Sequence, residues 1–226
     1  MEPHTAHRVL TPKLPLITRG FSLIEMIVVL AIIIVITGVI ISGQSTYNQT
    51  IILNDTAYTV AYSIRQAQSL GLASRSANSV SDAGYGVRFT GPSATSYLVF
   101  ADTGGSDFLS ESVCPVGAPG TPAPETKPGN CRYDGDPPDK IIQNYSFSRG
   151  FTLQGVCGKA GTGSCTPEQS IDVVFMRPET RAIIVGESGR SYTCAQVTVT
   201  APTGGATRTV RVSQLGEISV GDQGCP

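Results

Sequence analysis

The sequence predicts an α+β protein in which one long N-terminal helix packs on antiparallel β-sheets. An unbroken apolar run from Phe21 to Ile41 predicts the first half of that helix. Apolar residues at helical spacing between Leu53 and Leu72 predict an amphipathic second half. From Gly84 onward apolar and polar residues alternate, and turn residues separate the runs, as is typical of antiparallel sheets.

The apolar run is long enough to cross a membrane. Its 21 residues would form a helix about 32 Å long, which matches the thickness of a bilayer's hydrocarbon core. A secretory signal peptide would have a shorter apolar region, followed by small residues at a cleavage site. Arg8, Lys13 and Arg19 precede the run and predict that residues 1–20 stay in the cytoplasm, so that the rest of the chain is exported.

The second half of the helix carries a stripe of apolar and small residues at intervals of three and four. The stripe consists of Leu53, Ala57, Val60, Ala61, Ile64, Ala67, Gly71 and Leu72. We expect it to pack on the globular domain, and we expect the helix to end near residues 74–78, within a turn-rich run that continues to Asp82. The alternative interpretation of the stripe is a coiled coil with a second helix.

Eight later stretches have the alternation of β-strands, and short Gly-rich turns separate many of them. The first two flank Gly91 and Pro92 and should form a hairpin. The expected strands are 85–90, 96–101, 141–147, 171–176, 181–186, 192–200, 207–212 and 217–220. Because consecutive strands are joined by short turns, the sheets should be mainly antiparallel.

The composition argues against several classes of function. The formal net charge is −1, so no nucleic-acid partner is predicted. His4 and His7 are the only histidines, and both precede the apolar run. Without residues 1–20 the chain has no histidine for a Ser-His-Asp or Cys-His centre, or for a histidine-ligated metal. We therefore expect neither an enzyme nor a cofactor-binding protein.

The six cysteines are predicted to form disulfides. All of them follow the apolar run, and none lies in a CxxC pair of the kind that commonly ligates zinc. An even number of widely spaced cysteines in an exported domain favours disulfides, and reduced thiols in the core are the alternative. Six cysteines allow fifteen pairings. The least demanding, local pairing joins Cys114 to Cys131, Cys157 to Cys165 and Cys194 to Cys225.

The stretch between Asp102 and Asp139 has a different composition from the rest of the domain. Pro and Gly fill residues 115–124, which cannot form a strand ladder and are expected to be a surface loop. Asp134, Asp136 and Asp139 raise the question of a calcium site. Because Pro137 and Pro138 interrupt the cluster and no DxDxDG-like loop is present, a solvated turn without metal is predicted.

Glu25 is the one charged residue between Phe21 and Asn54, one turn inside the apolar run. A carboxylate in a membrane-spanning helix costs up to about 3 kcal/mol, and snorkelling to the interface is one way to reduce that cost. The segment Arg19-Gly20-Phe21-Ser22-Leu23-Ile24-Glu25 resembles the class III signal of type IV pilins and pseudopilins. The resemblance implies the pilin fold, cleavage after Gly20 by a prepilin peptidase, N-methylation of Phe21, and a role for Glu25 in assembly.

Several weaker motifs resemble the GspH/FimT group of minor pseudopilins and minor pilins. They comprise Gly84–Phe89, Tyr97–Asp102, Ile171–Phe175 and Val210–Ile218. The resemblance implies a domain order of a cytoplasmic leader (1–20), a transmembrane and assembly helix (21–43), an amphipathic continuation (44–78) and a disulfide-containing β-rich domain (79–226).

The implied function is that of a structural subunit of a pilus or a type II secretion pseudopilus. The implied partners are other subunits, the prepilin peptidase, an inner-membrane assembly platform and, before assembly, membrane lipid. The alternatives are a major pilin or an adhesin displayed at the filament tip. The protein would first be anchored in the inner membrane with its C-terminal domain outside the cytoplasm.

Overall fold

The computed structural model describes residues 20–73, 76–77, 83–104, 114, 129–177, 180–203 and 205–226. For residues 42–46 it describes the helical backbone and not the side chains. The predicted leader before residue 20, most of the predicted helix exit and the predicted Pro/Gly loop at 115–124 lie outside these residues. The chain divides into two compact units, residues 1–45 and 46–226, which are taken separately below.

Helix α1 runs from Leu23 to Leu72 and is the one α-helix in the described part of the chain. Within the first unit, Leu23–Ile41 is apolar and long enough to span a membrane, and its side chains are exposed. Exposure of so many large apolar side chains is unfavourable in water and favourable in lipid. This segment could therefore act as a membrane anchor or as a signal sequence.

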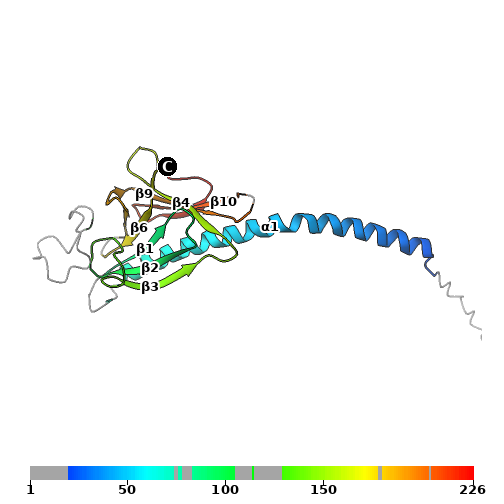
Figure 1. Ribbon diagram of the computed structural model, residues 1–226, viewed down its shortest axis with the longest axis horizontal. Helices are drawn as coiled ribbons and strands as arrows, with labels where there is room; N and C mark the ends of the chain where they lie inside the picture. The colour runs from blue at the N-terminus through cyan, green and yellow to red at the C-terminus, as the bar shows by residue number, and fades with distance from the viewer. Residues whose placement is uncertain are drawn as a thin grey trace, which may run out of the picture. The chain divides into compact units, whose positions relative to one another are not determined.

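In the second unit, α1 buries the predicted stripe in the core of the domain. Leu53, Ala57, Val60, Ile64 and Ala67 are each at most 1% exposed. They pack in one cluster with side chains from both sheets, so the packed-core interpretation of the stripe is confirmed. Figure 1 shows this part of α1, in cyan, alongside β1 and β2. The helix ends at Leu72, slightly before the predicted exit.

The first sheet has six antiparallel strands in the order β3-β2-β1-β6-β7-β8. Strands β1 and β2 form the expected hairpin, and β6 lies in the middle of the sheet with both faces buried. The strands are β1 (Gly84–Thr90), β2 (Ser96–Asp102), β3 (Lys140–Ser146), β6 (Ser170–Phe175), β7 (Ala182–Gly186) and β8 (Ser191–Tyr192).

The second sheet has five antiparallel strands in the order β11-β10-β9-β4-β5. The strands are β4 (Thr152–Lys159), β5 (Thr166–Glu168), β9 (Cys194–Thr200), β10 (Thr207–Ser213) and β11 (Ile218–Gly221). Leu153, Val197 and Val210 from this sheet join the same core cluster as α1 and the first sheet. The predicted α+β class with antiparallel sheets is thus confirmed.

Two features of the second sheet differ from the prediction. Strands β4 and β5 were not predicted. Strand β4 contains Gly155 and Gly158, which weaken a strand pattern, and β5 has only three residues, of which one is Pro167. A Cβ on Gly158 would lie 2.2 Å from the ring of Tyr192, so the packing requires this glycine. The expected strand 192–200 is divided at Thr193, because the chain passes there from the first sheet to the second.

Three disulfides link the domain, and they use all six cysteines. The pairs are Cys114–Cys131, Cys157–Cys165 and Cys194–Cys225, the same as in the local-pairing prediction. The second closes the β4–β5 hairpin and the third ties the C-terminal segment to the start of β9. Cross-links of this kind stabilise a fold largely by restricting the unfolded chain.

Replacement of Gly71 by alanine should destabilise the domain, although Gly→Ala inside a helix normally stabilises by up to about 1 kcal/mol. A Cβ on Gly71 would lie 2.3 Å from the backbone oxygen of Phe175, so the helix and β6 would have to separate. We expect a net loss of about 1–3 kcal/mol in the free energy of unfolding. Chemical denaturation measures it, with exposed Ser69→Ala as the control. An unchanged or raised stability of Gly71→Ala would contradict this packing.

Candidate functional site

The predicted processing segment lies at the start of the described chain. Gly20 and Phe21 are exposed and precede α1, so the peptide bond between them is not part of the helix. The carbonyl of Ser22 accepts hydrogen bonds from the backbone N–H groups of Glu25 (3.1 Å) and Met26 (3.2 Å), which form the first turn. A non-helical, exposed bond beside an ordered helix start is geometrically suited to proteolytic cleavage.

Glu25 occupies the first turn of α1 and is exposed. Ser22 and Glu25 have the spacing of a capping box, in which Ser at the N-cap is followed three residues later by Glu or Gln. A carboxylate at this end also interacts favourably with the helix dipole. The position of Glu25 thus gives it a local role at its own helix start, in addition to the assembly role that the resemblance implies.

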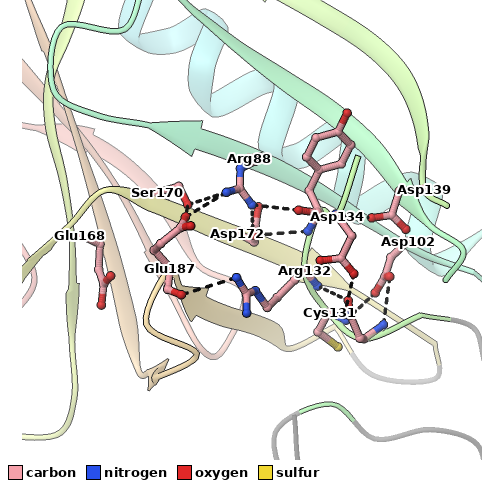
Figure 2. A network of polar contacts seen from close by, with 12 residues as sticks. Arg88, Asp102, Cys131, Arg132, Asp134, Asp139, Glu168, Ser170, Asp172 and Glu187 are labelled. Atoms are coloured by element: carbon pink, nitrogen blue, oxygen red, sulfur yellow. Dashed lines mark hydrogen bonds and ion pairs between the residues drawn. The ribbon is translucent and has the colours of Figure 1, made fainter. Parts of the chain in front are cut away.

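A polar network covers part of the face of the first sheet that points away from the main core (Figure 2). Arg88 of β1 lies directly opposite Asp172 of β6 in the strand register. Its guanidinium donates to Asp172 (2.8 Å), to Ser170 (2.7 Å) and to the carboxylate of Glu187 (3.0 Å). Ser170 in turn donates to Glu187. The guanidinium of Arg88 therefore forms ion pairs with two carboxylates, those of Asp172 and Glu187.

The same network fastens residues 129–139 onto the sheet. Arg88 donates to the carbonyl of Tyr133 (3.1 Å), and the N–H of Tyr133 donates to Asp172 (3.4 Å). The Tyr133 ring packs against Phe100 of β2, with ring centroids 5.3 Å apart. Cys114, Cys131 and Val174 are buried in the small apolar cluster beneath it. The segment is thus held by backbone hydrogen bonds, a ring contact and the Cys114–Cys131 disulfide together.

Two further buried carboxylates hold the ends of this segment. Asp102, at the end of β2, accepts from the backbone N–H groups of Asn130 (3.0 Å) and Cys131 (2.6 Å). Asp139 accepts from the N–H groups of Thr103 (3.0 Å), Gly104 (3.4 Å) and Asp134 (2.8 Å). Buried backbone N–H groups need such partners, and these two side chains provide them where no strand neighbour is present.

Burial alters the acidity of all three aspartates. It raises the pKa of Asp172 to about 7, although Arg88 acts in the opposite direction. It raises the pKa of Asp139 to about 6 against the effect of the backbone hydrogen bonds. Burial and, secondarily, the charge of Asp139 raise the pKa of Asp102 well above its ordinary value. Removal of a carboxylate from water disfavours its ionised form, which accounts for the common direction.

Asp134 and Asp136 are exposed, as expected for the solvated turn that the sequence predicts. Asp139 is fully buried rather than solvated, so the solvated-turn prediction is wrong for this residue. Both of its oxygens accept backbone hydrogen bonds, and the carboxylate of Asp136 accepts from the N–H of Ile141 (3.2 Å). Asp102, Cys114 and Cys131 lie close enough to hold an ion, but their two sulfur atoms form one disulfide and do not act as thiolate ligands.

The structure brings together residues that the sequence did not single out. Arg88 and Asp172 are charged residues within largely buried strands, and their positions at the same level of adjacent strands were not recognised. Cross-strand opposite charges on one face are a usable sequence signal. The network pairs most of its buried polar groups, but the Asp172 Oδ1 and Arg132 Nε atoms have no hydrogen-bond partner among the described residues. Comparisons with protein-family models, curated proteins and solved structures found no match.

The raised pKa values predict that the domain becomes more stable as the pH is lowered from about 8 to about 5. A buried aspartate with a raised pKa binds a proton more tightly in the folded state than in the unfolded state. Its contribution to the free energy of unfolding is therefore present at low pH. For Asp172 that contribution is lost as the pH rises from its ordinary pKa of 3.8 through about 7. Asparagine in place of Asp172 cannot ionise, so the stability of Asp172→Asn should depend less steeply on pH than that of the wild type.

Thermal unfolding of the oxidised full chain in detergent, across this pH range, measures the effect. Exposed Asp55→Asn is the matched control and should retain the wild-type slope. The interpretation fails if Asp172→Asn and the wild type lose stability with pH in parallel.

Proposed function

We propose that the chain is the precursor of a type IV pilin-like subunit, a minor pilin or a pseudopilin. It is cleaved after Gly20 by a prepilin peptidase, methylated at the new N-terminus of Phe21, and polymerised through α1 into a pilus or a type II secretion pseudopilus. The observation that carries the proposal is the combination of an exposed, non-helical Gly20–Phe21 bond with Glu25 in the first turn of α1, where the apolar segment Leu23–Ile41 contains no other charged residue.

Assembly would give Glu25 a partner of opposite charge. Cleavage creates an α-amine at Phe21, and methylation leaves that amine basic. In a filament core made of apolar helices, the amine of one subunit can pair with Glu25 of its neighbour. Charges attract far more strongly in such a medium than in water, and an unpaired carboxylate there is costly. The pair therefore favours one axial register between neighbouring helices.

The described domain is compatible with an exported structural subunit. Its six cysteines are all oxidised, which suits an extracytoplasmic compartment. One core joins α1 to both sheets, so the domain is tied to the helix that would enter the filament. On this proposal the protein is first a single-pass protein of the inner membrane, and it contacts lipid, the peptidase, the assembly platform and other subunits in turn.

The N-terminus of the mature protein is expected to be N-methyl-Phe21. Mass spectrometry of the chain from purified filaments should show loss of residues 1–20 and one added methyl group. Gly20→Val, which places a branched side chain at the cleaved bond, should leave the precursor in the membrane. Gly38→Ala, where a Cβ meets no atom within 4 Å, is the control and should be processed normally. Recovery of the intact leader from assembled filaments would rule out the proposed processing.

Glu25→Gln should permit cleavage and membrane insertion but prevent assembly or reduce it strongly. Glutamine removes the charge and keeps both the shape and the capping-box pattern, so the helix start loses only the modest interaction of a carboxylate with the helix dipole. The amine of Phe21 would be buried without its partner, at a cost of about 3–5 kcal/mol. Glu25→Asp keeps the charge on a shorter side chain and should assemble better than Glu25→Gln.

Filaments counted by electron microscopy, beside an immunoblot for processed protein, provide the measurement for these two variants. If Glu25 only snorkels to the membrane surface, Glu25→Gln will give normal filament numbers with normal processing. That result would end the assembly role proposed for this residue.

A further inference from the structure

The three disulfides of the domain differ in how well they are shielded from solvent. Both members of the Cys114–Cys131 pair are fully buried in an apolar cluster. In the Cys194–Cys225 pair, the cysteine of β9 is 6% exposed. Both members of the Cys157–Cys165 pair are half-buried, and neither belongs to an apolar cluster. Because thiol–disulfide exchange requires access to a sulfur atom, the last pair is the most open to attack by a thiol.

The Cys157–Cys165 disulfide fastens a flap, which we define as residues 160–168. The flap consists of the exposed residues 160–164, Cys165 and the short edge strand β5. It contributes no side chain to the three apolar clusters formed by the described residues. Since burial of apolar surface is the main source of a fold's stability, a segment without it opens at a low cost in free energy. The covalent link is therefore a major restraint on this flap.

Polar contacts also hold the flap to the rest of the domain. The three residues of β5 lie opposite residues 156–158 of β4 in an antiparallel ladder. The carboxylate of Glu168 accepts hydrogen bonds from the hydroxyl groups of Ser188 (2.8 Å) and Tyr192. The N–H of Gly161 donates to Thr193 Oγ1 (3.3 Å). Each hydrogen bond of this kind contributes about 1 kcal/mol net, so the flap can be released without loss of the core.

The flap closes a junction between the two sheets. Strand β5 belongs to the second sheet, whereas the groups that bind Glu168 belong to β8 and to the turn between β7 and β8, in the first sheet. Gly186 at the end of β7 faces the same side chain, since a Cβ there would lie 2.5 Å from the carboxyl carbon of Glu168. Release of the flap would break these contacts and leave residues 156–158 of β4 without a neighbour on that side. An unpaired edge of this kind can accept another strand.

The surroundings of the sulfur atoms point in the same direction as their exposure. A carboxylate oxygen of Asp102 lies within 4.8 Å of the sulfur atoms of Cys114 and Cys131. Cleavage of that disulfide would form a thiolate among apolar side chains and beside an acidic group, and both conditions disfavour a thiolate. Cys157 lies on the face of β4 opposite to Val156, which packs in the main core. A thiolate formed at Cys157 would therefore be partly solvated.

We propose that the Cys157–Cys165 disulfide is a redox latch, which a dithiol reductant opens while the domain stays folded, and that its opening releases the flap. One thiolate of the reductant attacks the sulfur of Cys165, and the S–S bond breaks to leave Cys157 as a thiolate that takes up a proton. The second thiolate of the reductant displaces Cys165, which also becomes a thiol, and the reductant leaves as a cyclic disulfide. The two cysteines are eight residues apart, so an oxidant can close the latch again at a small entropic cost. This inference does not depend on the proposed filament role.

Differential alkylation tests the order of cleavage. The oxidised full chain in detergent is treated with dithiothreitol for increasing times, and its free thiols are alkylated and located by peptide mass spectrometry. The Cys157–Cys165 disulfide should open at least about ten-fold faster than the other two, which serve as internal controls. Simultaneous cleavage of all three disulfides, or earlier cleavage of Cys114–Cys131 or Cys194–Cys225, would overturn the proposal.

Amide hydrogen exchange of the partly reduced chain tests the release of the flap. The amides of β5 should lose protection, whereas those of β6 and β10, which lie inside the two sheets, should keep it. Cys157→Ser/Cys165→Ser should give the same pattern without any reductant, which shows that dithiothreitol acts through this disulfide. Full protection of β5 in the double variant would refute the release. Loss of protection in β6 and β10 as well would refute a latch that opens locally.

Discussion

The domain depends on the burial of one face of α1 between two antiparallel sheets. The buried positions of the helix include small residues such as Ala57, Ala61 and Ala67, which pack in one cluster with side chains from both sheets. At its end the helix approaches β6 closely, since Gly71 faces the backbone of this strand with no room for a Cβ. Both sheets contribute to this single cluster, so the helix helps to bury the inner face of each. The helix is thus a central element of the domain core.

The outer face of the first sheet is organised by a different kind of interaction. Residues 129–139 cross it without forming a strand, so their backbone N–H groups need acceptors other than a neighbouring strand. Asp102, Asp139 and Asp172 supply those acceptors, each from a buried side chain. The cost of burying carboxylates is visible in their raised pKa values, and Arg88 offsets part of it for Asp172. The Cys114–Cys131 disulfide anchors the same region covalently.

The sequence was sufficient for the elements whose apolar pattern is regular. The helix, its buried stripe and most strands follow from periodicities that burial imposes directly. The sequence was insufficient where a contact with residues distant in the chain determines which residue type a position requires. Gly158 weakened the strand signal of β4, yet it is required by the ring of Tyr192. The division at Thr193 depends on how the two sheets are arranged, which local alternation does not encode.

The polar residues show the same division between local and tertiary information. Asp139 lies in a Pro-rich turn that looks solvated in sequence, and only the packing of the turn against the end of β2 buries it. Arg88 and Asp172 are separated by 84 residues along the chain, so their pairing depends on the β1–β6 register. The Gly20–Phe21–Glu25 pattern is different, because all of its parts are close in sequence. It could therefore be recognised without a fold.

On the proposed function, the Glu25–amine pair would fix the axial position of a subunit in the filament and leave its rotation largely free. A Glu25–amine pair in an apolar medium is strong, and its energy falls steeply when either partner is displaced along the axis. It constrains the rotation of a subunit about its own helix only weakly, because two charges on flexible ends meet from many angles. Contacts outside the apolar segment would therefore have to specify the direction in which each domain faces.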